Sequence, residues 1–183
     1  MKWGDENASS MSRVSGGYAA VVCYMASIFL ANWLLQRYGI IPIGFGLHAP
    51  AGVFAAGFAF VLRDEVQERL GVGWVIFAIV AGATISLTVS TTFAIASGVT
   101  FLVSEFADFA VYTPIRARSW IGAAVLSNTV GDLVDSVLFL LLAFGSLANV
   151  FGLMVGKWYA TVPVLVFYGW HRWRHAKEQE QSA

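Results

Sequence analysis

Four carboxylates lie inside long apolar runs of this chain, and they constrain its fold more than any other feature. Glu105 and Asp108 lie in one run, and Asp132 and Asp135 lie in the next. With 58% hydrophobic residues and a mean hydropathy of +0.70, the chain has the composition of a membrane protein. A charged side chain at the centre of a bilayer costs roughly 2.5–3.5 kcal/mol on insertion scales. The fold must therefore pair, protonate or hide these groups, which favours a polar cavity between helices.

Charge and cysteine content exclude several other classes of protein. The 11 basic and 11 acidic residues balance, and no basic stripe outside the short C-terminal tail indicates nucleic-acid binding. The single cysteine, Cys23, excludes an internal disulfide and a cysteine-based zinc site, and no histidine-rich helix face offers another zinc site. We therefore expect no cofactor, no metal and no nucleic-acid partner.

The apolar segments predict an all-α membrane protein with six transmembrane helices. A polar N-terminus (1–17) precedes a six-helix domain (18–170) and a charged tail (171–183). The uncharged run 72–104 would be roughly 50 Å long as one helix, against a hydrocarbon core of about 30 Å. It is therefore expected to turn back within 88–92. The predicted spans are about 18–35, 40–62, 72–89, 93–113, 120–144 and 150–170.

Prolines and glycines interrupt the first half of the second predicted span. Pro50 is expected in the first turn of a helix that continues to about Arg69, because proline is tolerated at that position. The stretch before Pro50 is expected to be a non-helical cap that lines the cavity, since irregular backbone at membrane depth must face protein or water.

Basic residues are strongly biased to one side of a six-span arrangement, because the other side receives only Arg37. The positive-inside rule then places both termini in the cytoplasm. The expected location of the chain is the plasma (inner) membrane. Tryptophans near the span ends, Trp158 among them, are interpreted as interfacial anchors with no other role. The residues on the basic side are Lys2, Arg13, Arg63, Arg69, Arg116, Arg118, Arg172, Arg174 and Lys177.

Two sets of residues with the spacing i, i+4, i+7, i+11 each share one helix face. Because the hairpin between the fourth and fifth spans joins them, the two faces are expected at similar depth. We expect them to line a cavity in the middle of the membrane. The sets are Phe101, Glu105, Asp108 and Tyr112 in the fourth span, and Asn128, Asp132, Asp135 and Phe139 in the fifth.

Lys157 is interpreted as the one basic residue buried in a span, and an ion pair with Asp132 or Asp135 is expected. The pair would either lock the helices together or take part directly in a ligand site. One lysine cannot neutralise four acids, so at least two carboxylates are expected to be protonated, hydrated or exposed to the cavity. Asp64 and Glu68, taken on charge alone, are interpreted as a solvated cytoplasmic loop with surface ion pairs.

Three segments of the chain together resemble the VUT family, also called the queuosine precursor transporter or YhhQ-like family. The segments span 51–71, 104–112 and 127–139. Asn32 and Gly156-Lys157 match further, weaker positions of the family. The most specific elements, in this order, are Asp64…Glu68-x-x-Gly71, Ser104-Glu105-x-x-Asp108 and Asp135-Ser136-x-x-Phe139.

This resemblance implies a six-helix fold similar to the substrate-binding components of energy-coupling-factor vitamin transporters. It implies import of a 7-deazaguanine queuosine precursor, 7-cyano-7-deazaguanine or 7-aminomethyl-7-deazaguanine, for tRNA modification. It also raises Asp64 and Glu68 to candidates for a gate or cytoplasmic-side site. The candidate substrate-binding residues are Glu105, Asp108, Asn128, Asp132, Asp135, Tyr112, Phe139 and Lys157.

Two alternatives remain beside a self-sufficient carrier for a purine-like solute. The chain could transport or bind another vitamin-like solute, either as a homo-oligomer or with an energising module on another chain, because it has no ATPase motif. The less favoured alternative is an intramembrane enzyme that uses two aspartates as an acid/base pair. An aspartyl protease of that kind needs Gly-x-Gly-Asp, whereas this chain has Thr129-Val130-Gly131-Asp132.

Overall fold

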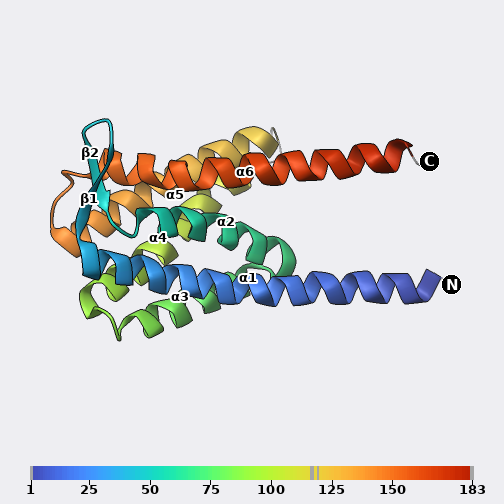
Figure 1. The fold of residues 1–183 in the computed structure, drawn as a ribbon, viewed down its shortest axis with the longest axis horizontal. Coiled ribbons are helices and arrows are strands. Elements are labelled where there is room, and N and C mark those ends of the chain that lie inside the picture. Colours follow the sequence, from blue (N-terminus) through green and yellow to red (C-terminus); the bar gives the residue numbers. More distant parts are fainter. Residues whose placement is uncertain (1, 116–117, 119, 182–183) are drawn as a thin grey trace.

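The computed structural model describes residues 2–115, 118 and 120–181, with the side chains at 2–13, 120–121, 123–125, 165 and 167–181 outside the description. Within these residues, six helices and one two-stranded sheet follow one another along the chain. Figure 1 shows the helices along the long axis, with both chain ends at one end of the molecule and the hairpin at the other. The elements are α1 (Lys2–Tyr38), β1 (Ile40–Gly44), β2 (Leu47–Pro50), α2 (Val53–Leu70), α3 (Val72–Ser86), α4 (Thr91–Ile115), α5 (Trp120–Phe144) and α6 (Val150–Gln181).

Three helices in the described part of the chain are long and apolar enough to cross a membrane. They cover Val14–Tyr38, Thr91–Ile115 and Leu126–Phe144. Helix α3 is apolar but has 15 residues, which gives a length of roughly 22 Å against a hydrocarbon core of about 30 Å. The C-terminal half of α2 is charged, and α6 carries Lys157. The structure thus supports a helical membrane protein, and six spans stay a prediction.

Several predicted boundaries agree with the structure. Helix α5 runs from Trp120 to Phe144 as predicted, and the chain turns between α3 and α4 within 87–90. Helical structure continues further than the predicted spans at both ends, from Lys2 and to Gln181.

The all-α prediction is wrong for 40–50, which forms an antiparallel hairpin. Proline lacks a backbone donor, and three consecutive residues at the tip, Gly44, Phe45 and Gly46, have positive φ values of 101°, 52° and 73°. Neither feature fits a helix interior. Pro50 ends β2 and does not lie in the first turn of α2, which begins at Val53. The prediction of non-helical backbone at this place is confirmed, and Pro50 is the residue of the stretch 40–50 that lines the cavity described below.

Glycines allow the hairpin and α6 to approach closely. A Cβ on Gly152 of α6 would lie 1.9 Å from the carbonyl oxygen of His48 in β2. One on Gly57 of α2 would lie 2.5 Å from the carbonyl oxygen of Lys157. Atoms cannot approach that closely, so glycine at these two positions sets how near α6 lies to β2 and α2. This approach brings Lys157 into the middle of the helix bundle.

Gly152→Ala is expected to destabilise the protein by roughly 1–3 kcal/mol, because the backbone of β2 must move away from the added methyl group. Thermal unfolding of the purified protein in detergent measures the change. Gly73→Ala is the matched control, since nothing lies within 4 Å of its Cβ and its φ is not positive. Equal unfolding temperatures for the two variants would contradict the close packing of α6 on β2.

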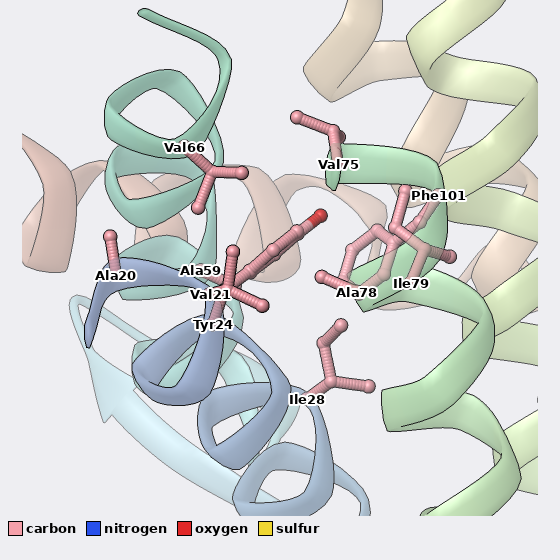
Figure 2. Close-up of a cluster of buried hydrophobic side chains, with 10 residues drawn as sticks. All are labelled: Ala20, Val21, Tyr24, Ile28, Ala59, Val66, Val75, Ala78, Ile79 and Phe101. Atoms are coloured by element: carbon pink, nitrogen blue, oxygen red, sulfur yellow. The ribbon is translucent and has the colours of Figure 1, made fainter. Parts of the chain in front are cut away.

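The main hydrophobic core joins α1, α2, α3 and α4. Figure 2 shows its side chains, with Tyr24 of α1 reaching between the helices. A second cluster under the hairpin contains Ala49, Val53, Leu140 and Leu153, and so joins β2, α2, α5 and α6. Four polar side chains, Asn32, Ser97, Asp135 and Lys157, line one cavity together with residues of both clusters. The main core consists of Ala20, Val21, Tyr24, Ile28, Ala59, Val66, Val75, Ala78, Ile79 and Phe101.

Candidate functional site

Lys157 of α6 lies at the centre of a buried ion-pair network with α5. Its side chain is 3% exposed. The Nζ atom donates to Asp132 Oδ1 and Ser136 Oγ, both at 2.9 Å, and to Asp135 Oδ2. An ammonium group has three hydrogens, so these three bonds use all of them. The predicted ion pair is confirmed, with both aspartates as partners where one was expected.

Asp132 has both carboxylate oxygens occupied. In addition to Lys157, Oδ1 accepts a bond from Ser136 Oγ at 3.3 Å, and Oδ2 accepts one from Trp158 Nε1 at 3.0 Å. Trp158 was predicted to be an anchor with no other role, and that prediction is wrong because its indole holds Asp132. A carboxylate with this many partners serves mainly to fix Lys157 in place.

Asp135 differs from Asp132 because one of its oxygens has no partner. Within the described residues, Oδ2 accepts the bond from Lys157 and Oδ1 accepts none. The residue is 3% exposed and lines a cavity between the helices. Of the two aspartates, Asp135 is therefore the one that offers a free acceptor to a solute.

A second buried network surrounds Arg63 of α2. Its Nη1 donates to Glu105 Oε2 at 3.0 Å, and its Nε and Nη2 donate to Asp64 Oδ1 at 3.0 and 2.8 Å. Nη2 also lies 3.5 Å from Asn128 Oδ1 and 3.9 Å from Asp108 Oδ2. One guanidinium thus ties α2 to α4 and α5.

The prediction that Lys157 is the one basic residue buried in a span is wrong, because Arg63 is only 5% exposed. Sequence reasoning counted it among cytoplasmic surface charges. Its signal was the spacing Ala59, Arg63, Val66, which places Arg63 on the buried face of α2. With two buried cations, each of the four carboxylates in the apolar runs has a positive charge within 4 Å. Glu105 Oε1 and Asp108 Oδ1 are still buried without a hydrogen-bond partner among the described residues.

The cavity that Asp135 lines, called the main cavity below, lies beneath the hairpin, between α1, α2, α4, α5 and α6. Its volume is about 40 Å³, which holds only a few water molecules at roughly 10–15 Å³ each. A larger solute therefore needs the helices to move apart. Two aromatic rings and four polar side chains contribute to its wall. These are Phe101 and Phe139, with Asn32, Ser97, Asp135 and Lys157.

Phe60 and Phe101 separate this cavity from the Arg63 network. The Phe60 ring centroid lies 5.2 Å from Lys157 Nζ and 5.6 Å from Arg63 Cζ. The two phenylalanine rings meet edge to face at 6.2 Å. A second cavity of about 10 Å³ lies on the other side, lined by Tyr24, Arg63 and Glu105 among others. The predicted single cavity is therefore divided into two polar regions.

The remaining predicted site residues lie outside the main cavity. Asn128, Asp108 and Glu105 belong to the Arg63 network, and Tyr112 is half-buried further along α4. Asp64 is 51% exposed and bonds to the buried Arg63, so it lies at the exposed edge of the Arg63 network, on helix α2 and not in a loop. Glu68 is exposed one turn further along α2.

These features describe a helical membrane protein with a buried cavity that is lined in part by polar side chains. Within the residues described, no group of His, Cys, Asp and Glu is placed to hold a metal ion. An aromatic pair beside a free carboxylate oxygen is suited to binding a flat ring with N–H donors.

Residues 87–170 match the model of a family described as "putative vitamin uptake transporter". No curated protein and no solved structure matches the chain. The matched region contains α4 and α5 and the part of α6 that carries Lys157. The match supports the resemblance to the VUT family and a transporter of the vitamin-uptake type, which is not an enzyme class. Asn32 and Arg63 lie outside the match.

Proposed function

We propose that the protein imports a flat purine-like solute, a 7-deazaguanine precursor of queuosine, across the plasma membrane. The observation that carries the proposal is the free Oδ1 atom of Asp135 in a cavity lined by Phe101 and Phe139. The family match to a vitamin uptake transporter supports the transport function. The queuosine precursor itself rests on the resemblance of the sequence segments and on the chemistry of this cavity.

The cavity fits the hydrogen-bonding edge of a 7-deazaguanine. That edge carries adjacent ring N–H and amino donors, and a carboxylate can accept both at once. Phe101 and Phe139 can stack on the ring, which contributes about 1–3 kcal/mol per base in single-stranded nucleic-acid binding. A carboxylate held for these donors also rejects analogues that lack them, because it would be left buried and unpaired.

The other site residues receive supporting roles in this proposal. Asp132 holds Lys157, which in turn fixes Asp135. Arg63 with Glu105, Asp108 and Asn128 forms the next polar region beyond Phe60. Tyr112 on α4, and Asp64 and Glu68 on α2, belong to the gate at the end of the molecule where both termini lie, which the basic residues place in the cytoplasm.

Uptake of labelled 7-cyano-7-deazaguanine into cells that cannot make it tests the function. Wild-type protein is expected to raise uptake well above an empty vector. Asp135→Asn is expected to lower uptake roughly 10- to 100-fold, because it replaces a charged acceptor whose hydrogen bonds contribute about 1.5–3 kcal/mol. Uptake is normalised to the amount of protein in the membrane.

Glu65→Gln is the matched control for this substitution. Glu65 pairs with Arg69 on the partly exposed side of α2 and lines neither cavity. The Glu65→Gln variant is expected to take up labelled 7-cyano-7-deazaguanine at the wild-type rate. Wild-type uptake no higher than the empty vector would overturn the proposed function, and unchanged uptake by Asp135→Asn would remove Asp135 from the binding site.

A further inference from the structure

We infer that Asn32 of α1 is the amide that recognises the ring carbonyl of the solute and thereby determines specificity, with Ser97 as its positioning residue. This inference rests on the proposed function and deepens it. The sequence analysis placed Asn128, and not Asn32, among the candidate substrate-binding residues. The structure places Asn128 beside Arg63, outside the main cavity, whereas Asn32 lines that cavity together with Asp135.

Asn32 is buried, and only one of the two polar atoms of its side-chain amide has a hydrogen-bond partner. Asn32 is 2% exposed, and its Oδ1 accepts a hydrogen bond from Ser97 Oγ at 2.7 Å. Its Nδ2 is buried and has no partner among the described residues. An amide that only joined α1 to α4 would be expected to satisfy both ends, because a buried donor without a partner destabilises the fold. The unused N–H group therefore indicates a ligand.

Ser97 fixes the direction of the Asn32 amide. Ser97 is itself buried, and it lies on α4 one turn before Phe101, the aromatic ring of the same cavity. Ser97 Oγ lies 2.7 Å from Asn32 Oδ1 and 2.5 Å from the carbonyl oxygen of Phe93 on its own helix, and a hydroxyl has one hydrogen to donate. When that hydrogen is donated to Asn32 Oδ1, Nδ2 is the group available to the cavity. A carbonyl oxygen is the acceptor that such a donor binds.

The cavity then presents two different recognition groups from two different sides of the bundle. Asp135 on α5 offers an acceptor, and Asn32 on α1 offers a donor. No hydrogen bond in the described part of the chain joins Asn32 to Asp135, so either side chain can be substituted without removing a hydrogen bond of the other. A guanine-like edge has the complementary pattern, with N–H donors next to a carbonyl acceptor. The substrate class is therefore a flat heteroaromatic lactam with an adjacent amino group.

The test compares two competitors of labelled 7-cyano-7-deazaguanine uptake, 7-deazaguanine and 7-deaza-6-thioguanine. The thio compound keeps both kinds of N–H donor and replaces the carbonyl oxygen with sulfur, a weak acceptor. Wild-type protein is expected to be inhibited at a concentration at least 10-fold lower by 7-deazaguanine. Asn32→Leu, which has a similar shape and no donor, is expected to reduce this preference to less than 3-fold.

Asp135→Asn is the matched comparison within the same cavity. It should weaken inhibition by both competitors alike and keep the preference for the carbonyl compound, because the carbonyl contact does not involve Asp135. Ser97→Ala should reduce the preference in the same direction as Asn32→Leu but by less, and it serves as the second variant should Asn32→Leu fail to reach the membrane.

Two outcomes separate this inference from the proposed function. If wild-type protein takes up no labelled 7-cyano-7-deazaguanine, the proposed function fails and the inference fails with it. If wild-type protein takes up the solute and prefers the carbonyl compound, but Asn32→Leu and Ser97→Ala keep the full preference, the inference alone is overturned.

Discussion

Replacing Lys157 with methionine is expected to abolish uptake and to destabilise the protein by about 3–5 kcal/mol. The substitution keeps the length of the side chain but removes the three donors that satisfy Asp132, Asp135 and Ser136. Two carboxylates with 7% and 3% exposure would then lie next to each other without a cation. Removing one partner of a buried ion pair costs more than the pair itself contributes, because the remaining charge stays desolvated.

A neutral version of the network separates stability from transport. The triple variant Asp132→Asn, Asp135→Asn, Lys157→Met has nearly the same volume and no charge left in this network. It is expected to regain most of the stability lost in Lys157→Met, since well-packed neutral groups often replace buried ion pairs without loss. It should still fail to transport, because no carboxylate remains in the cavity. Thermal unfolding in detergent and uptake into cells measure the two properties on the same proteins.

Two results would contradict this assignment. If Lys157→Met unfolded at the wild-type temperature, the network would not be buried as the structure shows. If the triple variant transported at the wild-type rate, the charges would serve only to join α5 to α6, and the candidate binding site would lie elsewhere.

The sequence predicted the α4–α5 hairpin and the Lys157 pairing because both depend on local patterns. Apolar length set the helix boundaries, and the i, i+4, i+7 spacing placed Asp132 and Asp135 on the face toward α6. A lysine in an apolar run needs an acid, and few acids were within reach. These inferences need no knowledge of how distant helices pack.

The division of the site into two cavities could not be predicted in the same way. It depends on Phe60 and Phe101, which come from helices far apart in the sequence and meet only in the folded bundle. The role of Arg63 was hidden for a related reason, because it begins a charged stretch that resembles a surface segment by composition. Only its contacts with α4 and α5 show that the guanidinium faces inward.

The recognition role inferred for Asn32 also depends on long-range packing. Asn32 bonds to Ser97, 65 positions away in the sequence, and the cavity it shares with Asp135 forms only where α1 approaches α4 and α5. An asparagine in an apolar run is commonly a contact between helices. The unpartnered Nδ2 atom, which only a structure can show, is what distinguishes a ligand group from such a contact.

Arg63→Met is the second substitution with a large expected effect. It is expected to destabilise the protein by about 3–5 kcal/mol and to reduce uptake to the level of an empty vector. Glu105 is 4% exposed, and Arg63 is its hydrogen-bond partner among the described residues. Without Arg63, Glu105 would be a buried carboxylate with no cation, and Asp108 would lose its nearest positive charge.

Glu105→Gln should have a smaller effect on stability than Arg63→Met, and this asymmetry is the sharper part of the prediction. When Glu105 is neutral, Arg63 still has Asp64, which accepts its Nε and Nη2 at 3.0 and 2.8 Å. When Arg63 is absent, Glu105 has no comparable substitute. The double variant Arg63→Met, Glu105→Gln should therefore be more stable than Arg63→Met alone, because it also removes the buried, unpaired charge of Glu105.

Thermal unfolding of the three variants and of Glu65→Gln measures this order. Glu65→Gln removes one partner of an i, i+4 pair near the surface and should cost no more than about 0.5 kcal/mol. If Arg63→Met and Glu105→Gln were equally destabilised, Asp64 would not be the second partner that the structure shows. If Arg63→Met kept wild-type uptake, the polar region beyond Phe60 would take no part in the path of the solute. The solute would then have to leave the main cavity by another route.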